Sequence, residues 1–224
     1  MSASIVDVFL NWEVISRYLP DILGSLVYTI GLAVLIVAGG LALGTVLAVA
    51  RSAGSRPLAA LIVVYVDVMR TVPPMVYLII VFFCAPYLGL TLSPFESTWL
   101  TLTLILAAFI EECVWVGIRT LPAGQVEAAR STGLSWLRTM RHVVLPQAIR
   151  MMLGPITGKI AAITKETALG SVIGLTEILG TAESASSNSG NPSTLTVAVV
   201  LYLMIFVPVV VGSRYLEKNW NWKT

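Results

Sequence analysis

The chain has 224 residues, of which 57% are hydrophobic and only 12% are charged. Its mean hydropathy of +0.87 is far above that of a soluble domain and indicates a membrane protein. A net charge of +2 is too small to indicate nucleic-acid binding, and one histidine with two cysteines in apolar stretches predicts neither a metal site nor a disulfide.

The N-terminal part predicts an interfacial segment followed by a first span. Residues 1–21 mix apolar with acidic side chains, as helices lying on a membrane surface do. Ile22 to Ala50 contains no charged residue and is long enough to span, which takes about 20 apolar residues. Gly40 and Gly44 either allow close contact with another helix or are simply tolerated in an apolar one.

The second apolar stretch, Leu58 to Tyr87, is too long for one straight span and contains Pro73 and Pro74. Proline removes a backbone donor and clashes with the preceding turn, so we expect a sharp kink or two segments. Asp67 and Arg70 lie three residues apart just before the break. This spacing favours a mutual ion pair near the cytoplasmic interface, and a role in gating is the alternative.

Trp99 to Ile118 predicts a third span that contains two adjacent carboxylates, Glu111 and Glu112. Adjacent residues of a helix point about 100° apart, so both cannot be buried on one face. A carboxylate inside a membrane indicates a functional site, whereas an ion pair with the nearby Arg119 is the structural alternative. Trp115 is expected to be an interfacial anchor or a cavity wall.

A polar and basic segment, Glu127 to Pro146, interrupts the apolar pattern. Its composition predicts two short helices joined by a turn at Gly133, the second capped by Ser135 and ending at about His142. The second helix has an apolar side and a basic side, formed by Leu134, Leu137, Met140 and Val144 and by Arg138 and Arg141. Such a helix lies on a membrane surface or docks into a partner.

The last part of the chain predicts two further spans and a polar loop between them. Ala148 to Val172 contains Lys159 and Lys165, so this segment is expected to be shielded by protein or to line water. Thr176 to Pro192 is rich in Ser, Asn and Gly and predicts a polar loop. Thr194 to Gly212 predicts the last span.

The basic residues predict the orientation of the chain. Those expected on one side are Arg51, Arg56, Arg119, Arg130, Arg138, Arg141, Arg150, Arg214, Lys218 and Lys223, whereas the opposite side has only Arg17. By the positive-inside rule, the prediction is an all-α membrane protein with five transmembrane helices, the N-terminus outside and the C-terminus in the cytoplasm. Its transmembrane domain is expected at 22–213 and its cytoplasmic tail at 214–224.

The motifs resemble those of a transporter family. The spacing of Glu127, Ala128 and Ala129, then Gly133 and finally a Leu-Pro pair resembles the EAA loop of ATP-binding-cassette (ABC) importer permeases. Residues 69–76 (MRTVPPMV), 108–118 (AFIEECVWVGI) and 165–169 (KETAL) are similar to motifs of the polar amino acid uptake permeases, which include histidine, glutamine and arginine types. The chain is therefore identified as a member of that family.

This resemblance implies the type I ABC importer permease fold in the bacterial cytoplasmic (inner) membrane. It implies a second permease subunit in a homodimer or heterodimer, ABC ATPase subunits that bind ATP and Mg²⁺, and an extracytoplasmic solute-binding protein. The cytoplasmic loop at 122–146, here called the coupling loop, would contact the ATPase through Glu127, Ala128, Ala129, Arg130 and Gly133. This chain would bind no cofactor and would be a transport subunit rather than an enzyme.

The resemblance also implies where a polar amino acid would bind. Glu112 matches the membrane carboxylate of the family, and Glu111, Arg70 and Trp115 are the further candidates for contact with the solute. A carboxylate in a cavity suits an ammonium group. Trp115 stands where the family has arginine, which indicates either an unusual amino acid or amine, or a binding site in the partner permease.

Two alternatives remain open. The nearest is an ABC permease for methionine, an osmolyte or another small amine, distinguished by the binding protein that accompanies it. The other is an ion-coupled secondary carrier that uses Glu111, Glu112, Asp67 and Lys165. Five spans without an inverted repeat argue against a carrier, and the lack of a nucleophile with a base argues against an enzyme.

Overall fold

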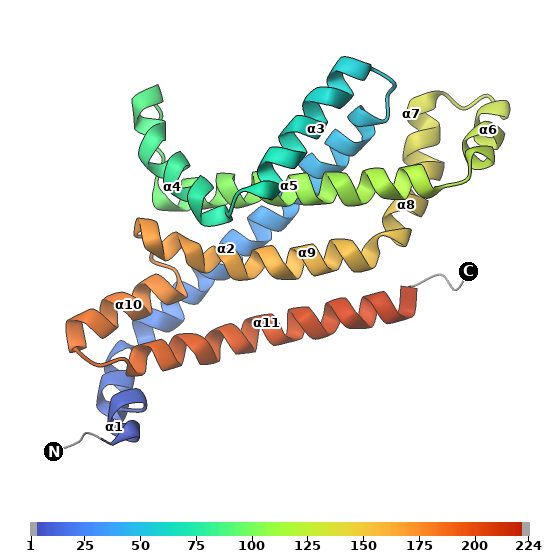
Figure 1. Cartoon of the computed structure of the whole chain (residues 1–224). Coiled ribbons are helices and arrows are strands. Elements are labelled where there is room, and N and C mark those ends of the chain that lie inside the picture. The colour runs from blue at the N-terminus through green and yellow to red at the C-terminus, as the bar shows by residue number, and fades with distance from the viewer. Residues whose placement is uncertain (1–3, 221–224) are drawn as a thin grey trace. The chain divides into compact units, whose positions relative to one another are not determined.

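The computed structural model describes residues 4–220, which fold into helices with no β-strand among them, as predicted (Figure 1). The helices are α1 (Ile5–Phe9), α2 (Trp12–Arg51), α3 (Arg56–Thr71), α4 (Pro74–Cys84), the 3-10 helix η1 (Ala85–Leu88), α5 (Pro94–Thr120), α6 (Ala123–Ser131), α7 (Trp136–Thr139), the π-helical turn η2 (Met140–Val144), α8 (Leu145–Met151), α9 (Leu153–Lys165), the 3-10 helix η3 (Glu166–Ile173), α10 (Ile178–Ser189) and α11 (Ser193–Trp220). Residues 1–3 and 221–224 lie outside the described residues. They include Lys223, one of the basic residues on which the predicted orientation rests.

Three helical stretches are long and apolar enough to cross a membrane, namely Asp7–Arg51, Pro94–Thr120 and Ser193–Tyr215. The pair of α3 and α4 counts as a fourth if the broken stretch is one span. The break confirms the expected interruption at the prolines, since Val72 adopts the extended backbone that a following proline favours. The predicted span from Ala148 to Val172 is divided among α8, α9 and η3, so a fifth span stays a prediction.

The helices form two compact units, each built from segments that are distant in the sequence. The first unit contains the chain up to Ile36, Pro74–Leu102 and Ile163–Val209. The second contains Val37–Pro73, Thr103–Ala162 and the chain from Val210 onward.

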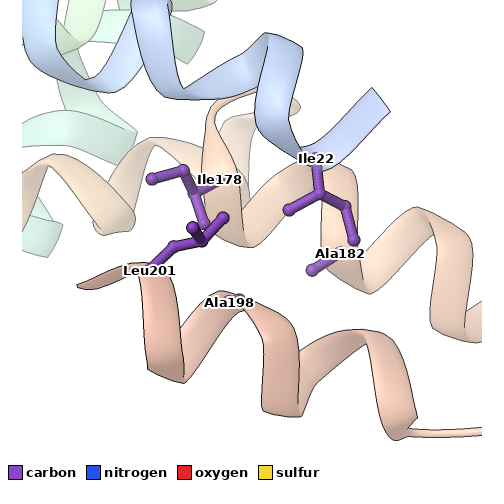
Figure 2. Packing of buried hydrophobic residues seen from close by; sticks show 5 residues of the cluster. All are labelled: Ile22, Ile178, Ala182, Ala198 and Leu201. Atoms are coloured by element: carbon purple, nitrogen blue, oxygen red, sulfur yellow. The ribbon is translucent and has the colours of Figure 1, made fainter. Parts of the chain in front are cut away.

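The core of the first unit is formed by α2, α10 and α11. Figure 2 shows the buried side chains that meet there, which are Ile22, Ile178, Ala182, Ala198 and Leu201. The prediction of a polar loop in this region is wrong, because α10 occupies most of it. Apolar residues at positions 178, 182 and 185 give this Ser- and Asn-rich segment one buried helical face.

Glu177 caps α10 and is fully buried. Its carboxylate accepts a hydrogen bond from the Gly180 N–H at 2.9 Å and another from the hydroxyl of Tyr202 in α11. Burial raises the pKa of the Glu177 carboxyl, and the charge of Glu183 acts in the same direction, whereas the two hydrogen bonds lower it. The start of α10 is thereby fixed against α11 by a buried acidic side chain.

In the second unit, α5 packs against the later part of α2 and against α3. A Cβ atom at Gly40 would lie 2.6 Å from the Leu106 side chain, and one at Gly44 would lie 2.6 Å from the Ala107 carbonyl oxygen. The two glycines therefore serve close helix contact, which decides between the two interpretations of this pair. On the other side, Ile62, Val66 and Ala108 form a buried cluster between α3 and α5.

Candidate functional site

The coupling loop folds into a helical hairpin in the second unit. Figure 1 shows α6 and α7 next to each other, and the two helices are in contact. Gly133 joins them with φ of +87°, a conformation that residues with a side chain rarely adopt. Two short helices with a glycine turn were predicted here, and the structure confirms them. Ser135 occupies the N-cap position of α7, although its side chain forms no capping hydrogen bond.

The second helix of the hairpin was expected to end at about His142, and this prediction is wrong. The helix continues through η2 into α8, which reaches Met151. A proline ring clashes with the carbonyl four residues earlier in an α-helix, and a π turn inserts extra backbone at that point. The π turn from Met140 to Val144 thus lets the helix pass Pro146 without a break. The Gln147 side chain donates to the Val143 carbonyl at 2.8 Å.

The hairpin has a buried face and an exposed face. Ala129, Met140 and Val144 are buried. Glu127, Ala128, Arg130, Arg138 and Arg141 are exposed. Leu137 was expected on the apolar side with Met140, but it lies in the first turn of α7 and is 64% exposed. The exposed face therefore combines charged side chains with one large apolar side chain, a composition suited to a partner protein.

A close helix contact places the hairpin relative to α5. A Cβ atom at Gly117 would lie 2.7 Å from the carbonyl oxygen of Ala148, so α5 and α8 touch through their backbones at this point. Any side chain at position 117 forces the helices apart. The return segment of the hairpin is therefore held directly against α5, the candidate span that carries Glu111 and Glu112.

Those two carboxylates form the centre of a charged cluster. Nη1 of Arg51 lies 3.2 Å from Oε2 of Glu111 and 3.3 Å from Oε2 of Glu112. Nη1 of Arg70 lies 3.6 Å from the same oxygen of Glu112. The Glu111 side chain is completely buried, whereas those of Glu112 and Arg70 are 30% and 36% exposed. The cluster therefore has a buried half around Glu111 and an accessible half around Glu112.

Aromatic rings support the cations of this cluster. The guanidinium carbon of Arg51 lies 3.6 Å from the centre of the Trp115 ring. Phe109 has Arg70 at 5.4 Å on its ring and the ammonium nitrogen of Lys159 at 4.0 Å. Cations over aromatic faces are attracted by the negative charge density of the ring. Three cations and two carboxylates are thus assembled around two rings.

The structure brings together all four residues predicted to contact solute, namely Glu112, Glu111, Arg70 and Trp115. The expected ion pair between Asp67 and Arg70 is wrong, since Arg70 pairs with Glu112 instead. An ion pair of the carboxylates with Arg119 is wrong too, because Arg51 takes that role.

Sequence reasoning missed three members of the cluster, Arg51, Phe109 and Lys159. Arg51 is the last residue of α2, and a charge at the end of an apolar span was taken to report topology. Its pairing with Glu111 crosses 60 positions, a distance that no local spacing rule covers. Phe109 lies on α5 within one turn of Glu111 and Glu112, and its position within a helical turn was the available signal.

Comparison with known proteins gives one family. Residues 40–221 match the family described as the binding-protein-dependent transport system inner membrane component. The "Probable glutamine ABC transporter permease protein GlnM" of Bacillus subtilis is 32% identical over 86% of this chain and 89% of its own length. The arginine transport system permease protein ArtQ of the same organism is 30% identical over 90% of this chain and 94% of its own.

Solved structures agree on the fold. An amino acid ABC transporter crystallised with histidines has a chain that superposes with a TM-score of 0.81, at 24% identity, covering 98% of this chain and 100% of that one. A chain of the MetNI methionine ABC transporter superposes with a TM-score of 0.64, at 19% identity, covering 97% and 99% of the two chains. The chain therefore belongs to the binding-protein-dependent transport system inner membrane component family and is similar to permeases of amino acid ABC transporters.

Proposed function

We propose that this chain is the permease subunit of an ATP-driven importer of polar amino acids in a bacterial cytoplasmic membrane. It would span the membrane five times, with its N-terminus outside and its C-terminus inside. It would pair with a second permease subunit, with ABC ATPase subunits that bind ATP and Mg²⁺, and with an extracytoplasmic solute-binding protein. Its contribution is the difference in free energy between two conformations of the path rather than bond chemistry.

The exposed face of the coupling hairpin carries this proposal. Glu127, Ala128 and Arg130 on α6 are exposed, and so is Leu137 on α7, so this face combines charged side chains with a large apolar one. Ala129 fixes α6 from its buried side, and Gly133 sets the turn between the helices. When ATPase subunits that bind this face close on each other, their movement would reach α5 through the contact of Gly117 with Ala148.

The accessible half of the charged cluster is the proposed solute site. Arg70 and Glu112 are exposed enough to meet a zwitterion, with the α-carboxylate at Arg70 and the ammonium at Glu112. The distance of 3.6 Å between Arg70 and Glu112 is longer than the distances of 3.2 Å and 3.3 Å from Arg51 to Glu111 and Glu112. The solute would therefore replace the contact between Arg70 and Glu112 more easily than the contacts of Arg51. Glu111 and Trp115 would act as positioning residues, because both hold Arg51.

The alternatives differ in support. A permease for methionine or another small amine uses the same hairpin and differs only in the solute. An ion-coupled carrier has no support among the relatives, which are permeases of ABC transporters. It would also leave the exposed face of the hairpin without a partner.

Co-purification tests the assembly directly. The tagged chain is purified in mild detergent from its own membrane, and stoichiometric partners are identified by mass spectrometry. The proposal predicts an ABC ATPase and a permease, and it predicts that Glu127→Arg releases the ATPase alone. Glu183→Arg changes an exposed carboxylate on α10 and serves as the control that keeps the ATPase bound. Reproducible absence of an ATPase from the intact chain would contradict the proposal.

A further inference from the structure

A pocket of about 370 Å³ lies in the second unit, where the ends of α2 and α5 face the hairpin helices. Arg51 and Arg119 line it together with Trp115 and Trp136, and Thr139 belongs to the lining as well. None of the described residues that line it is acidic. Glu111, Glu112 and Arg70 do not line the pocket, whereas Arg51 and Trp115 border both the pocket and the charged cluster.

Two polar side chains at this pocket have no hydrogen-bond or ion-pair partner within residues 4–220, although the guanidinium carbon of Arg119 lies 5.8 Å from the centre of the Trp115 ring. Arg119 forms no ion pair there, whereas the charge of Arg51 is balanced by Glu111 and Glu112. The Thr139 side chain is 1% exposed, and its hydroxyl forms no hydrogen bond. Buried hydroxyl groups in folded proteins nearly always have a partner, so an unpartnered one at a pocket points to a ligand.

The depth of the pocket favours a particular ligand chemistry. Arg51 is the last residue of one candidate span, and Trp115 and Arg119 lie in the last two turns of another. Span ends lie at the level of the phospholipid head groups, where tryptophan is enriched. Basic pockets between helices on the cytoplasmic side suit phosphate-bearing groups.

We propose that this pocket binds a phosphoryl group, held by the Arg119 guanidinium and the Thr139 hydroxyl. The group comes from an anionic phospholipid of the cytoplasmic leaflet or from free phosphate. The guanidinium donates charge-assisted hydrogen bonds to the phosphoryl oxygens, and the hydroxyl donates a further one. Trp136 and Val126 belong to the hairpin, so an occupied pocket links the hairpin to the ends of α2 and α5.

Binding to the delipidated full-length chain tests this proposal without any transport assay. Phosphatidylglycerol is titrated by native mass spectrometry, with diacylglycerol as the lipid that lacks phosphate. Inorganic phosphate is titrated by calorimetry. One retained phosphatidylglycerol supports a lipid source, saturable heat from inorganic phosphate supports a free source, and binding of neither probe overturns the proposal.

Matched variants locate the site. Arg119→Gln is expected to weaken binding of whichever probe binds the parent chain, phosphatidylglycerol or inorganic phosphate, by about tenfold or more, because it removes a charged donor. Thr139→Val, which keeps the side-chain volume, is expected to weaken it by about tenfold, and Thr139→Ser to retain it. Arg56→Gln removes an exposed charge that does not line the pocket and leaves binding unchanged. Binding that neither Arg119→Gln nor Thr139→Val weakens would overturn the proposal, whatever the chain transports.

Discussion

Arg51 holds the buried carboxylate of Glu111, with 3.2 Å between Nη1 and Oε2, across 60 positions of the chain. The pair joins the last residue of α2 to α5. Glu111 has no exposed surface, and Arg51 is its only ion-pair partner among the described residues. Its charge is tolerable at this depth because a guanidinium neutralises it.

Removal of Arg51 alone should therefore destabilise the chain. We expect Arg51→Gln to lower the free energy of unfolding by about 3 kcal/mol, since it leaves a buried carboxylate without its cation. The double variant Arg51→Gln with Glu111→Gln should recover most of this loss, because no charge stays buried. Denaturant-induced unfolding in detergent measures the free energy of unfolding of the single and the double variant. A double variant less stable than the single one would show that the ion pair is not the cause.

Gly117 should tolerate no side chain. Gly117→Val places atoms 2.7 Å or less from the Ala148 carbonyl and should cost about 1–3 kcal/mol of stability through overpacking. It should also reduce the ATPase stimulation that passes through the hairpin. Gly158→Ala is the control, because a Cβ atom there meets no heavy atom within 4 Å. If the two variants had equal melting temperatures, the claim that the contact between Gly117 and Ala148 holds the hairpin against α5 would be contradicted.

The accessible half of the charged cluster should set the affinity for solute. In proteoliposomes that contain the whole importer, Arg70→Gln and Glu112→Gln should each raise KM for labelled glutamine, arginine or histidine by about tenfold or more. Asp67→Asn is a matched control, since Asp67 is exposed on the same helix as Arg70 and forms no ion pair among the described residues. Unchanged KM in both cluster variants would move the solute site to the partner permease.

Glu177 should make the stability of the chain depend on pH. Its pKa is raised in the folded state by burial, so folding favours the protonated carboxyl. The favourable contribution is complete below the pKa of the unfolded state and is lost as the pH rises through the folded pKa. Thermal unfolding between roughly pH 4 and pH 8 should therefore show the parent losing stability relative to Glu177→Gln as the pH rises. A constant difference across this range would contradict the burial effect.

The sequence was sufficient for features that local chemistry decides. Gly133 was predicted to turn the coupling loop, and the structure gives it φ of +87°. The break before Pro73 was predicted for the same kind of reason, since the proline ring restricts the residue before it. Glu111, Glu112 and Arg70 were noticed because charges are rare in apolar spans, and the family resemblance made them candidates for contact with solute.

Features that depend on distant packing could not be predicted. α10 was missed because its apolar face is built from Ile178 and two alanines, a pattern too weak to stand out among serines and asparagines. The passage of the helix beyond Pro146 depends on a π turn that has no sequence signature. The partnership of Arg51 with Glu111 required the packing of α2 on α5 to be known.

The central claim is that the coupling hairpin transmits the ATPase cycle to the membrane helices. It is tested most directly by solute-stimulated ATP hydrolysis in the complete importer with its binding protein, for the parent and for Glu127→Arg and Gly133→Val. We predict that both variants insert and assemble with the second permease but lose the stimulation by about tenfold or more, since one reverses an exposed charge and the other strains a backbone with positive φ. Full stimulation in both variants would contradict the claim.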